Sequence, residues 1–403
     1  MNRCFLIHSL AAGGAERWVA TMANHWATRD AGPGASVTII TMAPPAQDFY
    51  ALHPAVRRIS LGHDTVSAGL GGAVAKNLAR LRALRRALQE AMPQGLPGTV
   101  QAGMVVAVMP ESSCLLALAA LTWPSRTSRT SRTWVAIGAE RSHPPLNPLG
   151  RARSLARAVL YGRLDAVACQ TRPSADWILR HTLARRAPVI PNPVIWPLPR
   201  QAPLLDPTPA FPEQKTLLTV GRLAPEKGFD RLLQAFAGLA PRHPQWRLVI
   251  LGEGPGRAGL EAQRQALRLQ DRVSLPGLAG NVGDWYAAAD VFVLTSRYEG
   301  FPNTLLEALA AGLPAVSVDC DTGPREILRH GVDGLLVPQD DSPGPGNGPE
   351  NGLAAALDRM MADDALRRAC AARAVEVRDR FALPHIAAQW DALVTELAAR
   401  RRP

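Results

Sequence analysis

The segment Val291–Glu307 constrains the fold more than any other part of the chain, because it has the pattern of a buried strand, a loop and a helix. The apolar run Val291–Leu294 is typical of a parallel strand that is covered on both faces. Asn303–Ala311 has helical periodicity and ends at Gly312, as helices often do. This order of elements favours an α/β fold with an open, parallel sheet.

Two carboxylates flank this loop, Glu299 and Glu307, with seven residues between them. Glu299 follows the strand, at the edge where open α/β sheets bind ligands, because strand ends and helix N-termini present free backbone N–H groups there. It can reach the hydroxyls of a sugar held over the helix N-terminus. Glu307 lies about one turn into the helix, where it can accept two hydrogen bonds from a diol such as a ribose. A solvated helix face is the alternative for Glu307, and it is the better one for that residue in isolation.

A second strand, loop and helix, over Leu217–Phe229, brings cations to the same edge. Arg222 leaves the strand end, and Lys227 precedes the helix that Gly228 opens. The planar fork of an arginine and the mobile charge of a lysine together suit a diphosphate, and each charge-assisted hydrogen bond contributes about 1.5–3 kcal/mol. Two surface cations beside a turn are the alternative, which these residues alone leave open.

Gly13 and Gly14 form a turn between a strand predicted over Arg3–His8 and a helix predicted over Ala15–Thr28. Glycine backbone can approach a phosphate closely because no side chain obstructs it, and the helix N-terminus adds partial positive charge. A plain tight turn is the alternative, and for a lone pair of glycines it would be the better explanation.

Taken together, these segments resemble the retaining glycosyltransferases of family 4, a large group with the GT-B fold that transfers sugars from nucleotide donors. The resemblance covers nearly the whole chain. It is strongest where the two glutamates are followed by further motifs in the family's order and spacing. The segments that carry it are Ser9–Arg17, Ile190–Val194, Gly221–Gly228, Glu299–Glu307, Gly312–Ser317, Asp321–Ile327 and Gly331–Val337.

The resemblance implies two Rossmann-like, doubly wound α/β domains that face each other across a cleft. A chain of 403 residues suits two domains of ordinary size. We expect an acceptor-binding domain over residues 1–195, a proline-rich linker over 196–212 and a nucleotide-sugar domain over 213–380. Two helices are predicted near the C-terminus, over Asp364–Phe381 and Pro384–Ala399. The last segment, 381–403, would pack back on the first domain.

The mechanism that the resemblance implies is transfer with retention at the anomeric carbon, without a metal and without a cofactor, since the nucleotide sugar is a substrate. Arg222 and Lys227 would stabilise the leaving diphosphate, while Glu299 would orient the donor sugar. These three are the expected catalytic residues. The expected donor-binding residues are Gly13, Gly14, Arg222, Lys227, Leu278, Glu299, Asn303, Thr304 and Glu307.

The chain departs from the family at the strand end after Trp134–Gly138. Many members place a histidine there that faces the donor sugar, whereas this chain has Glu140 and Arg141 and, slightly farther on, His143. We expect these three residues on the acceptor side, and the sequence leaves open which of them contacts sugar. For His143, a simple loop position before a proline is the favoured alternative.

A net charge of +11 predicts an acidic partner. An amphipathic helix is predicted over Ala73–Met92, and Arg400–Arg402 adds charge at the end of the chain. The helix carries apolar Val74, Leu78, Leu81, Leu84 and Leu88 and basic Lys76, Arg80, Arg82, Arg85 and Arg86, and a second basic stretch has Arg151, Arg153, Arg157 and Arg163. We expect peripheral association with anionic lipid. The alternative is a solvated helix whose apolar side covers the sheet of the first domain.

Other partners and locations are disfavoured. Nucleic acid is not expected, because no recognised motif or aromatic platform accompanies the charge. The five cysteines have neither zinc-site nor disulfide spacing. Met1–Ala12 fits a strand better than a signal sequence, because it lacks a clear cleavage motif. We therefore expect the protein in the cytoplasm, on the inner face of the cell membrane.

We predict a glycosyltransferase that moves a hexose or N-acetylhexosamine from a UDP donor to a lipid-linked or surface glycan. A non-catalytic, membrane-associated scaffold is one alternative, although it has no need for all four charged donor residues. A sugar-nucleotide epimerase is another, although it would lack a basic acceptor face. A nicotinamide oxidoreductase is rejected, because Gly252–Gly256 lacks the dinucleotide spacing and the next strand ends in Pro276-Gly277 without an acidic residue.

Overall fold

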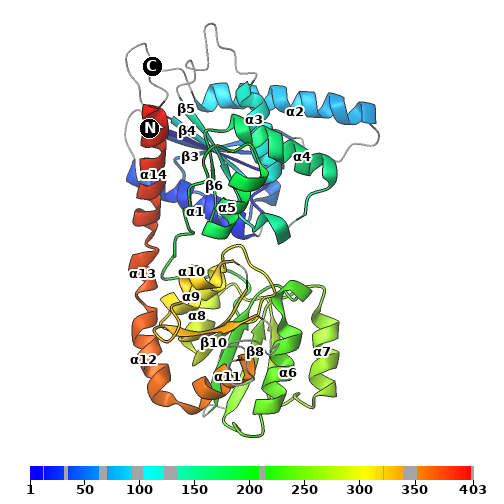
Figure 1. Ribbon diagram of the computed structural model, residues 1–403, viewed down its shortest axis with the longest axis vertical. Coiled ribbons are helices and arrows are strands. Elements are labelled where there is room, and N and C mark those ends of the chain that lie inside the picture. The colour runs from blue at the N-terminus through cyan, green and yellow to red at the C-terminus, as the bar shows by residue number, and fades with distance from the viewer. Residues whose placement is uncertain are drawn as a thin grey trace. The chain divides into compact units, whose positions relative to one another are not determined.

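Two units, each with its own sheet, make up the computed structural model of the chain (Figure 1). Contacts within the chain assign Met1–Pro193 and Leu383–Pro403 to unit 1 and Val194–Ala382 to unit 2. The structure describes residues 1–11, 13–30, 35–62, 70–92, 103–121, 134–146, 148–207, 214–320, 322–339 and 352–400, without the side chains of 70–76. The predicted α/β class with two parallel, Rossmann-like sheets is confirmed.

Unit 1 holds a six-stranded parallel sheet in the order β3-β2-β1-β4-β5-β6. The strand order reverses between β1 and β4, and ligands of open α/β sheets bind at the carboxyl ends of strands at such a point. The strands are β1 (Asn2–Ile7), β2 (Ser36–Thr41), β3 (Val56–Ser60), β4 (Gly103–Val108), β5 (Trp134–Ala139) and β6 (Ala166–Ala168).

Helices cover both faces of this sheet, because alternate side chains of its strands point to opposite sides. Phe5 of β1 lies in one core cluster with Trp18 and Trp390, whereas its neighbour Leu6 lies in another with Leu84 and Tyr161. The first core belongs to α1 (Gly14–Arg29) and α14 (Leu383–Ala399), and the second to α2 (Leu70–Ala91), α3 (Pro110–Leu121), α4 (Arg151–Leu160) and α5 (Arg172–His181). Unit 1 also has the 3-10 turns η1 (Pro45–Gln47), η3 (Pro144–Leu146) and η4 (Tyr161–Arg163).

Unit 2 repeats the arrangement, with the strand order β12-β11-β10-β7-β8-β9. All its pairs are parallel. Its strands are β7 (Lys215–Val220), β8 (Trp246–Leu251), β9 (Val273–Gly277), β10 (Val291–Leu294), β11 (Ala315–Asp319) and β12 (Gly334–Pro338). Its helices are η5 (Pro225–Lys227), α6 (Phe229–Leu239), α7 (Arg257–Ala266), α8 (Val282–Ala287), α9 (Asn303–Ala310), α10 (Pro324–Ile327), α11 (Leu353–Ala362), α12 (Asp364–Ala374) and α13 (Val377–Arg380).

The C-terminal helices differ in part from the prediction. A single helix over Asp364–Phe381 is wrong, because α12 ends at Ala374 and the short α13 follows it. The last helix does pack in unit 1, as expected, since Trp390 and its apolar neighbours lie in the core around β1. The strand β9 is two residues longer than the strand predicted over 273–275, because Pro276 and Gly277 belong to it, and its register shifts there.

The border between the units falls between Pro193 and Val194, just before the predicted linker. Residues 196–207 have no helix or strand, and 208–212 lie outside the described residues. None of the described helices is both long enough and apolar enough to span a membrane.

Candidate functional site

The predicted donor residues of unit 2, apart from Leu278, gather where β7 and β10 end. These strands are direct neighbours in the sheet, with Leu217 and Leu218 paired to Val291 and Phe292. Because the strands are parallel, the loops that follow them leave the sheet at the same edge. The cations after β7 and the carboxylate after β10 are therefore brought together, as the sequence predicts.

Lys227 and Glu299 form an ion pair at this edge, with Nζ 2.7 Å from Oε1. Their side chains are only 24% and 11% exposed. The Ser296 hydroxyl donates to the same carboxylate oxygen at 2.6 Å, and the Thr322 hydroxyl donates to the backbone carbonyl of Glu299. Both the carboxylate and the backbone of Glu299 are thus fixed by neighbours that sequence reasoning had not assigned to the site.

Gly228 allows the loop after β7 to reach the end of β10. Its φ is +65°, and a Cβ there would lie 2.1 Å from the backbone oxygen of Thr295. Any other residue would therefore collide with backbone as well as adopt a disfavoured conformation. The Thr295 hydroxyl donates to the carbonyl of Lys227 at 3.0 Å. This close approach is what places Lys227 beside the carboxylate.

Arg222 is more exposed than Lys227 and has a carboxylate partner of its own. Its Nη2 donates to Oε1 of Glu226 at 2.5 Å, and the two side chains are 70% and 17% exposed. Burial opposes the charge of Glu226, but hydrogen bonds from its own backbone and from Arg222 hold its pKa below the ordinary value. Each predicted phosphate-binding cation of unit 2 therefore has a carboxylate partner within the chain.

Glu307 lies inside unit 2 and is 7% exposed, so a solvated helix face is the wrong description of it. The Tyr286 hydroxyl lies 3.3 Å from Glu307 Oε2 and 3.3 Å from the Thr304 carbonyl. Asn303 and Thr304 form the first turn of α9. Tyr286 was missed, and its place in the apolar stretch of α8 gives no signal that would have identified it.

Leu278 lies farther along the same edge. It follows β9, and β7 and β8 separate that strand from β10 in the sheet. Its side chain is 59% exposed, which is high for an aliphatic residue. The structure thus places it at the predicted edge but not beside the charged residues.

In unit 1, the two glycines lie where β1 leads into α1. Gly13 is the N-cap of the helix, and Gly14 is its first residue. The Tyr50 hydroxyl accepts from the Gly13 N–H at 3.2 Å and donates to the Gly13 carbonyl at 2.9 Å. Tyr50 lies far from the turn in the sequence and was not predicted to support it.

Glu140 follows β5 and is buried in unit 1, at 1% exposure. The Tyr161 hydroxyl donates to its Oε1 at 2.5 Å, while Oε2 has no hydrogen-bond partner within the described residues. Burial raises the pKa of Glu140 to about 7, although the hydrogen bond from Tyr161 and the charge of Arg157 act in the opposite direction. A carboxyl group in such surroundings takes up a proton easily.

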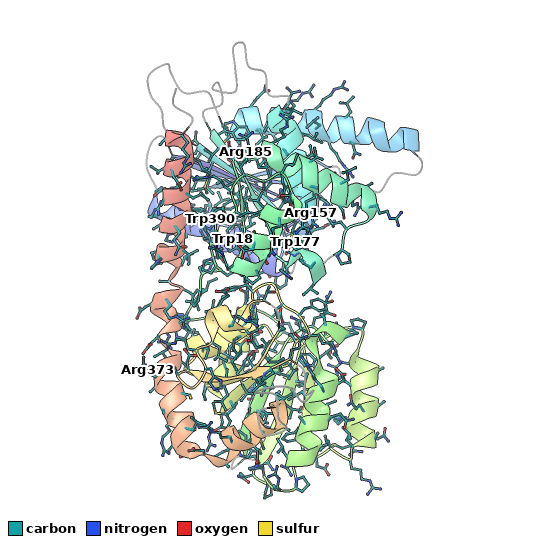
Figure 2. The ribbon with its side chains drawn as sticks, in the orientation of Figure 1. Trp18, Arg157, Trp177, Arg185, Arg373 and Trp390 are labelled. Carbon is teal, nitrogen blue, oxygen red and sulfur yellow. The ribbon has the colours of Figure 1, made fainter. Side chains whose placement is uncertain are left out.

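Arg141 packs against the aromatic core of unit 1. Its guanidinium lies 4.1 Å from the centre of the Trp18 ring and donates to Oδ1 of Asn192. Trp18 in turn packs against Trp390 of α14, with ring centroids 5.4 Å apart (Figure 2). Burial lowers the pKa of Arg141 to about 9. His143 lies apart from this group, with Nδ1 2.9 Å from the Ser174 hydroxyl.

Known proteins resemble the chain over part of its length. Residues 204–377 match the family model described as glycosyl transferases group 1. An exopolysaccharide phosphotransferase of Streptomyces coelicolor is 40% identical over 242 residues, which is 59% of this chain and 24% of that protein. A Campylobacter jejuni protein named N-acetylgalactosamine-N,N'-diacetylbacillosaminyl-diphospho-undecaprenol 4-alpha-N-acetylgalactosaminyltransferase is 36% identical over 157 residues, 39% of this chain and 40% of that protein. The chain spans less than half the length of these relatives.

Two solved structures match nearly the whole chain. Sucrose-phosphate synthase from Thermosynechococcus elongatus has a TM-score of 0.76 and 21% identity, and covers 99% of this chain and 100% of its own. Anabaena HepE in complex with UDP has a TM-score of 0.73 and 18% identity, and covers 98% and 100%. At these identities the likeness shows the fold alone, and it confirms the predicted GT-B class. The family model matches less than half of the chain, so the likeness to the glycosyl transferases group 1 family is limited to residues 204–377.

Proposed function

We propose that the protein is a retaining glycosyltransferase that uses a nucleotide sugar, a UDP-sugar, as donor. It moves a hexose or N-acetylhexosamine to a lipid-linked or surface glycan, and it needs neither a metal nor another cofactor. The observation that carries the proposal is the Lys227–Glu299 ion pair at the carboxyl edge of the sheet, next to the first turn of α9. This pair lies within the segment that matches the glycosyl transferases family model.

The pair suits donor binding because each charge can exchange its partner. When a diphosphate arrives, the Lys227 ammonium turns from Glu299 to the phosphate, and Arg222 does the same from Glu226. Glu299 is then free to accept hydrogen bonds from hydroxyls of the donor sugar, and Glu307 from the ribose. The exchange replaces one charge-assisted contact with another, so little free energy is lost in breaking the first.

In the transfer step, the bond between the anomeric carbon and the phosphate oxygen breaks, and its electron pair leaves with the nucleoside diphosphate. The acceptor oxygen forms the new bond from the same face of the sugar, which retains the configuration. The acceptor proton passes to the leaving phosphate oxygen, so no separate base is required. Fixed cations at the leaving group stabilise the growing negative charge, and such contributions are typically 10²–10³-fold in kcat.

For the acceptor we propose a lipid-linked glycan at the inner face of the cell membrane. The Campylobacter jejuni relative is named for a diphospho-undecaprenol acceptor, and the HepE structure holds UDP. All five cysteines are free and four of them are buried, which is typical of a reducing compartment such as the cytoplasm. Nucleic acid is not proposed as a partner.

The proposal is tested by calorimetric binding of UDP, GDP, ADP and their common sugars, followed by incubation with lipid-linked glycan acceptors. We expect binding of one nucleotide that weakens in Arg222→Ala and Lys227→Ala but not in Arg242→Ala, whose arginine is similarly exposed and paired. Mass spectrometry of the product distinguishes an added sugar from an added phosphate. The second outcome is included because the Streptomyces coelicolor relative is named a phosphotransferase. NMR of the new linkage reports its configuration, and a chelator tests metal independence.

Three outcomes would overturn the proposal. Binding without any product would favour the scaffold, provided that acceptors of several kinds had been supplied. Conversion of the donor sugar without an acceptor would favour an epimerase. Binding that is the same in Lys227→Ala would remove the diphosphate assignment, whatever the product.

A further inference from the structure

Four residues of α4 and η4 recur at every fourth position and point outward: Arg151, Leu155, Val159 and Arg163. Residues four apart lie on the same face of an α-helix, so the three in α4 form a stripe, and Arg163 follows it in η4. Leu155 is 66% exposed and Val159 is 47% exposed, and the arginines at both ends are exposed as well. The two apolar residues therefore lie between two cationic ones.

The same helix buries an arginine. Arg157 is 5% exposed, and its guanidinium lies 4.7 Å from the centre of the Trp177 ring on α5 (Figure 2). The sequence groups Arg157 with three other arginines in a basic stretch, but unlike Arg151, Arg153 and Arg163 its side chain is buried. A helix that faced only water and its own core would expose the arginine and bury the leucine. Core packing therefore does not explain the outer face of α4.

A third apolar side chain comes from the turn after α5. Leu183 is 64% exposed, and its backbone N–H donates to the Ala158 carbonyl at 2.7 Å. A Cβ on Gly162 would lie 2.8 Å from the Leu183 Cβ, so this leucine sits directly against the end of α4. Two segments thus place exposed aliphatic side chains at one point of unit 1.

The surroundings of this patch are strongly cationic. Residues 151–186 contain only two acidic side chains, Asp165 and Asp176. They contain eight arginines, at 151, 153, 157, 163, 172, 180, 185 and 186. Asp176 pairs with Arg172, and within the described residues no acidic partner within ion-pair distance is found for Arg151, Arg163 or Arg185. Their charge is available to an anionic partner.

We propose that Leu155, Val159 and Leu183, with Arg151 and Arg163 beside them, dock the protein on an anionic lipid bilayer. The aliphatic side chains enter the boundary between headgroups and acyl chains, and the arginines bind lipid phosphates while their stems lie along the apolar surface. This inference deepens the membrane association proposed above and rests on it. It moves the docking surface from the basic helix α2, whose Leu84 and Leu88 are buried in the core, to α4.

A second copy of the chain is a poorer occupant of the patch. A two-fold contact would bring the same patch of each copy together, so arginines would face arginines. Each partner in a stable interface also buries roughly 800 Å², which three partly exposed aliphatic side chains cannot supply. A bilayer with anionic headgroups removes both difficulties.

The test is co-sedimentation of the full chain with vesicles of phosphatidylcholine alone or mixed with phosphatidylglycerol. We expect binding only to the mixed vesicles. Leu155→Ser/Val159→Ser/Leu183→Ser should weaken it at least tenfold, and Arg151→Gln and Arg163→Gln about fivefold each. Leu204→Ser is the matched control, because Leu204 is 62% exposed but lies in unit 2, and it should bind as the wild type does.

Several results would overturn the proposal. The first is full binding by the triple variant, or loss of binding in Arg82→Gln/Arg86→Gln while the triple variant still binds. The second is a wild-type protein that does not bind vesicles but forms a dimer in solution, together with a triple variant that is a monomer. If the triple variant does not fold, Leu155→Ser alone replaces it in the test, because Leu155 is exposed and its substitution should not disturb folding. Calorimetry with UDP, measured on the same variants, separates this test from the proposed function, because UDP binding should not change.

Discussion

The two sheet edges that carry the predicted site differ in the partners of their charged side chains. At the carboxyl edge of unit 2, each cation faces an anion: Lys227 pairs with Glu299, and Arg222 with Glu226. At the edge of unit 1, Glu140 faces the neutral hydroxyl of Tyr161, deep in the core. At the edge of unit 2 the charges form ion pairs, whereas at the edge of unit 1 burial disfavours the charged form of Glu140.

The difference shows which edge is prepared for an anionic ligand. A cation with an exchangeable partner can turn to a phosphate at little cost, because one ion pair replaces another. A buried carboxyl group with a neutral partner has no such exchange, and its raised pKa reports the cost of charging it. We therefore expect changes in unit 2 to alter binding and turnover, and changes at Glu140 to alter stability first.

The largest effect is expected for Lys227→Ala, which removes the cation nearest to Glu299. The leaving diphosphate loses a fixed charge, so kcat should fall on the order of 10²–10³-fold, or about 2.7–4 kcal/mol. Lys215→Ala is the matched control, since Lys215 begins the same strand and pairs with Asp364 at the opposite end of it. Steady-state kinetics with the donor found by calorimetry would measure both. Equal losses in the two variants would mean that the site is placed at the wrong edge.

Glu140→Gln should change how stability depends on pH. The pKa of Glu140 is raised from 4.5 to about 7 in the folded protein. The folded state thus holds a proton that the unfolded state releases, and the stability gained is present below pH 4.5 and lost as pH rises through about 7. The free energy of unfolding of wild type relative to Glu140→Gln should fall by up to about 3 kcal/mol over this range.

Urea unfolding at several pH values would measure this difference. Glu261→Gln is a suitable control, because Glu261 lies in unit 2 and is 45% exposed. A difference between wild type and Glu140→Gln that does not vary with pH would contradict the raised pKa. A large loss of turnover in Glu140→Gln without any loss of stability would instead mean that Glu140 contacts the substrate.

Much of unit 2 could be predicted from the sequence because its signals are local. The run Val291–Leu294, the following loop and the helix from Asn303 stand next to one another in the chain, and the structure reproduces them within one residue. Lys227 and Glu299 are far apart in sequence, but both follow parallel strands, so their meeting follows from the fold class. The neighbours that hold Glu299, Arg222 and Glu307 carried no pattern of their own; they are Ser296, Glu226 and Tyr286.

Unit 1 was harder because its decisive contacts are distant in sequence. The strand end at Glu140 could be located, but its burial depends on Tyr161, and the position of Arg141 depends on Trp18 and Asn192. The basic stretch in α4 could be located, but charge alone does not show which of its arginines packs on Trp177. Side-chain packing between separate elements decides these points, and periodicity within one element does not.

Tyr50→Phe tests the support of the glycine turn at the edge of unit 1. The change removes both hydrogen bonds between Tyr50 and Gly13, after which the Gly13 carbonyl still accepts from the Arg17 N–H and the Gly13 N–H can bind water because the loop is partly exposed. We expect the free energy of unfolding to fall by about 1 kcal/mol, with faster hydrogen exchange at Gly13 and its neighbours. Unchanged exchange there would show that Tyr50 does not hold the turn in solution.

The smallest effect, and the one that bears most directly on exchangeable partners, is expected for Glu226→Gln. If Glu226 only pairs with Arg222 until a diphosphate binds, removing its charge should tighten UDP binding by up to about fivefold, because an exposed ion pair contributes about 0.2–1 kcal/mol. The gain should shrink at high salt and disappear in the Arg222→Ala background. Glu261→Gln, in another i,i+4 pair with an arginine, should leave UDP binding unchanged. Weaker UDP binding by Glu226→Gln would mean that Glu226 holds Arg222 in position rather than competing with the diphosphate for it. Glu226 in unit 2 and Glu140 in unit 1 would then differ in exposure but not in their structural role.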